Sequence, residues 1–156
     1  MVYTTSVKRQ THDRPVRQLP NGVVFSCVGY RVRRLSRIVS GIYDEALAPL
    51  KLKISQFTIL VALDRRGPST AVDLCRLLTM DKSTASRNLQ RLRRRGWISL
   101  VEARDGSGQK LSLTRDGMQV LREAYPLWRK AQGEATRRLR ADGLNALDTV
   151  LARING

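Results

Sequence analysis

The chain has 156 residues, of which 42% are hydrophobic, enough apolar surface for one buried core. Its 29 lysine and arginine residues against 13 aspartate and glutamate residues give a formal net charge of +16, which favours a polyanionic partner. No apolar run approaches the roughly 18 residues of a membrane span. We expect residues 1–22 to be a flexible basic segment, and they lack the apolar core of a secretory signal, so we expect a soluble, cytoplasmic protein without a membrane partner.

The first predicted helix covers residues 23–50. Its apolar residues recur at intervals of three and four and so form one stripe: Val28, Val32, Leu35, Val39, Ile42 and Ala46. Pro49 ends the helix, and the opposite face is rich in arginine, which is typical of a solvated helix face.

Two short helices are predicted next. The first starts after Ser55 and ends near the Gly67-Pro68 break. The second opens at Thr70, which forms a capping box with Asp73. We expect its apolar side chains to face the core: Val72, Leu74, Leu77 and Leu78.

A fourth helix starts at Asp81, whose carboxylate can accept hydrogen bonds from free backbone amides, and closes at Gly96. The spacing of Ala85, Leu89 and Leu92 turns these three residues towards the core. The remaining polar residues are predicted to point outwards or sideways: Ser83, Thr84, Ser86, Arg87, Asn88, Gln90 and Arg91.

A β-hairpin follows, with strands predicted at residues 97–101 and 110–114 and a glycine-rich turn at residues 105–108. The rest of the chain is helical, with caps at Thr114 and Asp116, a bend at Pro126 and a break at residues 142–143. The predicted fold is therefore mainly α with a small β-wing.

Two short helices joined by a tight turn, followed by a hairpin, are the parts of a winged helix-turn-helix, which we place at residues 51–116. Arginine can pair with guanine, asparagine and glutamine can pair with adenine, and serine or threonine can contact either bases or phosphates. Residues 53–115 contain 13 basic and 5 acidic residues, a local charge of +8 (13 minus 5). The candidate DNA-binding residues are Lys82, Ser83, Thr84, Ser86, Arg87, Asn88, Gln90 and Arg91 on the fourth helix, with Arg104 and Lys110 in the wing.

Several segments resemble the multiple-antibiotic-resistance regulator (MarR) family. They are YDEALAPL at residues 43–50, ISQF at 54–57, MDKSTASR at 80–87 and LSLTRDG at 111–117. The resemblance runs from about Val24 to the C-terminus, and it implies a homodimer in which the dimerisation helices at residues 23–50 and 117–156 intertwine. Each subunit would then present its winged helix-turn-helix to half of a palindromic operator in double-stranded DNA.

The wing departs from the family pattern. Members usually follow the wing aspartate with an arginine pair, whereas Asp105 is followed by Gly106 and Ser107. Either Arg104 or Lys110 could replace the usual minor-groove arginine, or this wing contributes less to DNA binding.

The resemblance also implies ways of regulating DNA binding. Many members release DNA when a small aromatic or phenolic compound binds between the dimerisation helices and the DNA-binding region, and Tyr30 and Tyr43 are the candidates for lining such a pocket. Other members respond to cysteine oxidation, for which Cys27 is the candidate, although a small packed residue is the more common role of such a cysteine.

The sequence thus predicts a sequence-specific transcriptional regulator, a repressor released by a small-molecule ligand. Thiol-based redox sensing through Cys27 and nonspecific architectural DNA binding remain as alternatives. With one histidine, two cysteines, no metal-ligand cluster and no nucleophile motif, we expect no enzyme activity, no metal and no cofactor.

Overall fold

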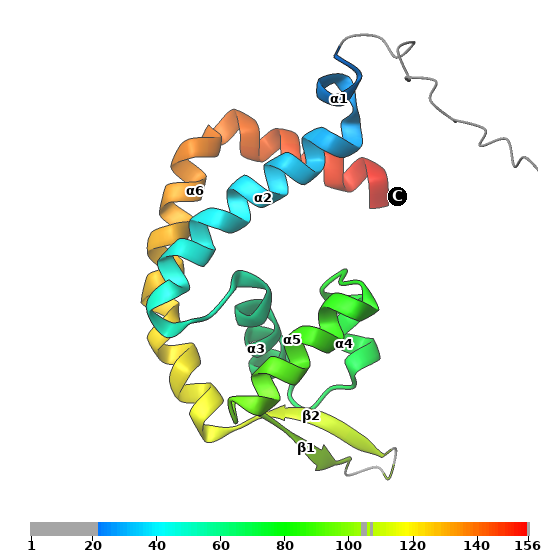
Figure 1. The fold of residues 1–156 in the computed structure, drawn as a ribbon, viewed down its shortest axis with the longest axis vertical. Coiled ribbons are helices and arrows are strands. Elements are labelled where there is room, and N and C mark those ends of the chain that lie inside the picture. Colours follow the sequence, from blue (N-terminus) through cyan, green and yellow to red (C-terminus); the bar gives the residue numbers. More distant parts are fainter. Residues whose placement is uncertain (1–21, 104–105, 107, 156) are drawn as a thin grey trace, which may run out of the picture. The chain divides into compact units, whose positions relative to one another are not determined.

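A computed structural model describes residues 22–103, 106 and 108–155 of the chain. Its elements are α1 (Val23–Ser26), α2 (Val28–Leu47), η1 (Ala48–Leu50), α3 (Ile54–Arg66), α4 (Ala71–Leu77), α5 (Lys82–Arg94), β1 (Ile98–Glu102), β2 (Gln109–Leu113) and α6 (Arg115–Asn155). Figure 1 shows the two strands as a hairpin beside α3, α4 and α5. The predicted helical fold with a small β-wing is confirmed.

The described residues divide into two compact units, with the boundary after Leu35, inside α2. In the first unit, the rings of Phe25 and Tyr30 meet edge to face with centroids 5.9 Å apart. Val28 and Val32, which open the predicted apolar stripe, are 72% and 59% exposed. This part of the stripe is therefore left uncovered within the described chain.

No single helix among the described residues is long and apolar enough to cross a membrane. The segments Val28–Leu50 and Ile54–Arg66 reach that length and composition only together, as a pair bent by 77°.

The core of the second unit is built around α3. Seven large side chains are almost fully buried: Leu47, Leu52, Ile59, Leu60, Leu63, Leu74 and Leu92. The prediction that Val72 and Leu77 also face this core is wrong, because they are 61% and 41% exposed. At about 100° per residue, Val72 lies opposite Leu74 on α4, so the two cannot both face the core, and Leu77 lies in the last turn of the helix beside its C-cap.

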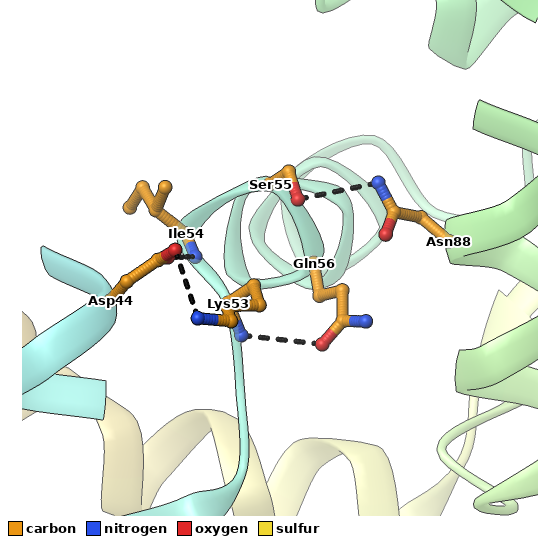
Figure 2. Close-up of polar contacts among 6 residues, drawn as sticks. All are labelled: Asp44, Lys53, Ile54, Ser55, Gln56 and Asn88. Atoms are coloured by element: carbon orange, nitrogen blue, oxygen red, sulfur yellow. Dashed lines mark hydrogen bonds and ion pairs between the residues drawn. The ribbon is translucent and has the colours of Figure 1, made fainter. Parts of the chain in front are cut away.

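A polar network fixes the start of α3 against the end of α2 (Figure 2). The Ile54 amide donates to Asp44 Oδ1 at 2.8 Å, and the Lys53 ammonium pairs with Asp44 Oδ2 at 3.2 Å. The Lys53 amide donates to Gln56 Oε1 at 3.2 Å. These bonds satisfy amides that a helix start leaves without intrahelical partners.

The wing is an antiparallel pair in which Ile98 lies opposite Leu113 and Glu102 opposite Gln109. Each strand is offset by one residue from its predicted range. A single residue before α4 adds to the sheet: the Ser69 amide donates to Leu111 O at 2.9 Å, and the Leu111 amide donates to Ser69 O at 2.8 Å. The wing is thereby hydrogen-bonded to the helix-turn-helix that precedes it.

The C-terminal helix α6 breaks at Arg140, which has a left-handed φ of 59°, and contains Pro126 without a break there. The predicted break at residues 142–143 is therefore two residues too late. Asp142 instead lies in the first turn after the break, where a carboxylate interacts favourably with the helix dipole.

Candidate nucleic-acid interface

Hydrogen bonds at their N-termini define the starts of α4 and α5. Thr70 Oγ1 accepts from the Asp73 amide at 3.1 Å and donates to Asp73 Oδ2 at 2.7 Å. Asp81 Oδ1 accepts from the Thr84 amide at 2.8 Å and from the Ser83 hydroxyl at 2.6 Å. Both predicted caps are confirmed, and they fix where each helix of the pair begins.

Replacing Asp81 by alanine is expected to lower the Tm, because the Thr84 amide loses its acceptor. The hydrogen bond from the Ser83 hydroxyl, followed by that from the Thr84 amide, holds the pKa of Asp81 far below its ordinary value of 3.8. The fold thus favours the carboxylate, so its stabilisation is complete above pH 3.8 and is lost as the pH falls towards the folded-state pKa.

Thermal unfolding of wild type and Asp81→Ala should therefore give a Tm difference that is constant from about pH 5 to 7 and shrinks below the ordinary aspartate pKa. Asp148→Ala, which removes an exposed carboxylate from α6, is the control. A Tm difference that does not change with pH would show that the carboxylate charge contributes nothing to the cap.

Helix α5 has a buried face and a strongly basic exposed face. Ala85, Asn88, Leu89 and Leu92 are buried, whereas Ser83, Arg87 and Gln90 are exposed on the opposite side. The helix contains five basic residues and no acidic one: Lys82, Arg87, Arg91, Arg93 and Arg94. The exposed face therefore combines positive charge with side chains that can read base edges.

Asn88 was predicted to point outwards as a DNA contact, and this is wrong. Its side chain is 6% exposed, and its Nδ2 donates to Ser55 Oγ of α3 at 3.3 Å (Figure 2). Asn88 lies three residues after Ala85 and so shares its buried side. The asparagine links α5 to α3 and is removed from the candidate list.

The structure brings most of the remaining α5 candidates onto one accessible surface. Lys82, Ser83, Ser86, Arg87, Gln90 and Arg91 are exposed, and Thr84 is half-buried. Arg87 Nη2 donates to Thr84 Oγ1 at 3.2 Å, so the arginine lies along the helix near its N-terminal turn. A side chain held in this way loses less conformational entropy when it binds a base.

The wing contributes less to the described surface. Lys110 is half-buried in β2, while Arg104 lies outside the described residues. Gly106 and Gly108 have φ of 72° and 94°, and the Ala103 amide donates to Gly108 O at 2.8 Å across the turn. Whether Arg104 or Lys110 replaces the usual wing arginine stays a prediction.

Sequence reasoning missed the role of Arg95. Its Nη1 and Nη2 donate to the carbonyl oxygens of Lys51 and Leu50 at 2.7 and 3.0 Å, and its guanidinium lies 3.5 Å from the centre of the Trp97 ring. Burial lowers the pKa of this arginine. Arg95 thus fixes the end of α5 against the turn before α3, a long-range contact without a local sequence pattern.

Among its described residues, the second unit contains two larger cavities, of which the first borders the exposed face of α5. The wing cavity, of about 620 Å³, is walled by α4, α5 and the wing and includes Val72, Ser86 and Leu100. The α3–α6 cavity, of about 570 Å³, includes Phe57, Arg122, Tyr125 and Trp128. The exposed Val72 that departs from the predicted core is thus part of a cavity wall.

The predicted pocket and redox residues lie elsewhere. Neither Tyr30 nor Tyr43 lines these two cavities, and the Tyr43 hydroxyl donates to Gln132 Oε1 at 2.5 Å. Burial raises the pKa of Tyr43. Cys27 is an exposed free thiol between α1 and α2. Among the described residues, no three His, Cys, Asp or Glu side chains are grouped closely enough to hold a metal ion.

Comparison with known proteins gives consistent results. A model of the MarR family matches residues 50–107. The multiple antibiotic resistance protein MarR of Salmonella typhimurium is 32% identical over 112 residues, covering 69% of this chain and 76% of the relative. Among solved structures, the chain is similar to a cysteine-to-serine mutant of MarR from E. coli in complex with operator DNA. The TM-score is 0.74 at 22% identity, and the match covers 87% of this chain and 99% of the MarR chain. The transcriptional repressor CouR bound to p-coumaroyl-CoA has a TM-score of 0.72 at 27% identity and covers 88% and 98% of the two chains.

Proposed function

The chain belongs to the MarR family of transcriptional regulators, and we propose that it regulates transcription by reading a palindromic operator as a homodimer. The observation that carries this proposal is the exposed face of α5, where Ser83, Arg87 and Gln90 stand on a basic helix whose start is fixed by Asp81. Such a helix can enter the major groove and place arginine and glutamine against base edges. A regulator of this kind acts on chromosomal DNA in the cytoplasm, and no catalytic role is proposed.

Uncovered apolar side chains near the two ends of the chain support the homodimer. On α2, Val28, Val32 and Ile38 are at least 51% exposed, and near the end of α6 Val150, Leu151 and Ile154 are at least 50% exposed. Burial in a symmetric dimer would remove these faces from water. We therefore assign residues 23–50 and 117–156 to dimerisation and residues 51–116 to DNA binding.

Repression relieved by a small molecule is the second part of the proposal. The α3–α6 cavity joins the DNA-binding region to a proposed dimerisation helix, so a ligand there contacts both. Phe57 and Trp128 stack with centroids 6.0 Å apart, and the lining holds two arginines, Arg65 and Arg122, against one carboxylate, that of Asp64. Aromatic walls with cations suit an aromatic carboxylate or phenol.

An aromatic carboxylate that releases the protein from DNA is therefore expected to quench the fluorescence of Trp128, with Trp97→Phe removing the other tryptophan. Arg122→Gln should weaken both quenching and DNA release, while Arg129→Gln, a charge change on α6 outside the cavity lining, should change neither. DNA release without any change at Trp128 would place the effector elsewhere.

The two alternatives are less well supported. For redox sensing, the described residues offer only the exposed free thiol of Cys27, and an exposed thiol alone does not link oxidation to DNA binding. Architectural binding predicts little preference between sequences, whereas a regulator keeps a specificity ratio of roughly a thousandfold or more.

The test is to bind the purified protein to fragments of the genome that encodes it and then to add a large excess of random-sequence duplex DNA as competitor. Retention of a few fragments supports a regulator, and uniform displacement supports an architectural protein.

A further inference from the structure

A third cavity, here called the basic pocket, lies between the start of α3 and the end of α5. It has a volume of about 390 Å³ and is lined by Lys51, Lys53, Gln56, Arg91, Arg94 and Arg95. Five of these six residues carry positive charge, and none is acidic. The Arg95 hydrogen bonds to Lys51 O and Leu50 O hold the end of α5 against the turn before α3.

The positive charge of the pocket is only partly balanced. Lys53 pairs with Asp44 at 3.2 Å, and the carboxyl end of α5 contributes roughly half a negative charge. Within the described chain, the side chains of Arg91 and Arg94 form no hydrogen bond or ion pair. Gathered like charges repel one another, so a bound anion would lower the energy of this arrangement.

The side-chain amide of Gln56 gives the pocket a hydrogen-bond donor that the fold holds in place. Its side chain is 5% exposed and its oxygen accepts the Lys53 amide, while among the described residues its amide nitrogen has no hydrogen-bond partner. In Figure 2 this nitrogen lies on the side of the amide turned away from Lys53 N. The guanidinium groups of the arginines, a lysine ammonium and a neutral amide together provide enough N–H donors to bind several oxygens of a tetrahedral anion.

We propose that the basic pocket is a phosphate-binding site at the C-terminal end of α5, beyond the base-reading residues Ser83, Arg87 and Gln90. Arg91, a candidate DNA-binding residue, is thereby assigned to a phosphate contact. Lys51, Arg91 and Arg94 supply the charge, and the buried Gln56 amide supplies an oriented neutral donor. The phosphate group comes either from the DNA backbone beside the major groove or from a separate phosphorylated ligand. Binding of free phosphate does not require the proposed regulatory function.

The site can be tested without DNA by titrating the full-length protein with inorganic phosphate. Chloride keeps the ionic strength constant during the titration. Wild type should bind phosphate saturably, and Arg94→Gln should bind about tenfold more weakly after losing a charge-assisted hydrogen bond. Lys51→Gly should also weaken binding and is compatible with the fold, because Lys51 has a left-handed φ of 50° that glycine adopts easily. Arg66→Gln, the same charge change at the end of α3 and outside the pocket, is the matched control.

The salt dependence of DNA binding distinguishes the two sources. If the pocket holds a backbone phosphate, Lys51→Gly should lower the slope of log K against log salt concentration by roughly 0.9 for each phosphate that the variant no longer neutralises. If the slope is unchanged while phosphate binding is weakened, the pocket serves a separate phosphorylated ligand. Equal responses to phosphate in wild type, Arg94→Gln, Lys51→Gly and Arg66→Gln would overturn the proposal, whatever the outcome of the DNA experiments.

Discussion

Replacement of Gly117 by alanine is expected to lower the free energy of unfolding by about 3 kcal/mol. A Cβ at this position would lie 2.1 Å from Trp97 O and 2.8 Å from Leu113 Cδ1. The first of these is a backbone atom that cannot rotate away. The start of α6 would have to move away from the wing.

Three hydrogen bonds explain why α6 lies so close to the wing. The Thr114 amide donates to Trp97 O at 3.0 Å, and the Thr114 hydroxyl donates to Gly96 O at 2.6 Å. The Gly117 amide donates in turn to Thr114 Oγ1 at 3.0 Å. The threonine and glycine of the LSLT-x-x-G segment therefore act together, one capping the helix and the other allowing its close approach.

Urea unfolding compares this variant with Gly133→Ala in the same helix. No atom lies within 4 Å of a Cβ at Gly133, so alanine should stabilise the protein by about 0.5–1 kcal/mol through its higher helix propensity. Opposite signs for the two substitutions are the expected result. A Gly117→Ala protein as stable as wild type would contradict the packing described here.

Arg87→Ala is expected to weaken operator binding by about 1–3 kcal/mol and to relax the preference for one base pair. Arg87 is exposed on the same side of α5 as Ser83 and Gln90, and its bond to Thr84 at 3.2 Å orients the guanidinium. An exposed side chain of this kind contributes little to the fold, so the stability of the variant should stay close to that of wild type.

Binding is measured against an operator and against every single-base variant of one half-site. Arg66→Ala, an exposed arginine at the end of α3, controls for the loss of one positive charge. Uniform weakening across all variants would assign Arg87 to a phosphate contact. Unchanged affinity and base preference would remove it from the interface.

Local patterns predicted the elements well because caps act within one helical turn. Thr70 with Asp73, and Asp81 with Thr84, make contacts three residues apart and can be read directly from the sequence. The positions that could not be predicted depend on distant partners. Asn88 is buried against Ser55, 33 residues earlier, and Arg95 binds carbonyl groups more than 40 residues away.

The sequence pattern also failed to predict which residues are buried on the short helix α4 and which residues meet at the end of α5. Val72 is apolar but lies opposite Leu74 on α4, and only the packing of this helix on the core decides which of the two faces inwards. Likewise, the basic pocket arises where Lys51 and Arg94 meet from segments more than 40 residues apart in the sequence. Only the tertiary structure brings these charges together.

Selection of binding sites from random duplex DNA by the purified protein, at near-physiological salt, tests the central claim most directly. We predict enrichment of a palindrome whose half-sites are separated by about one helical turn, because a two-fold dimer presents two copies of α5. Tight binding without enrichment of any sequence would contradict the assignment of α5 as a base-reading helix.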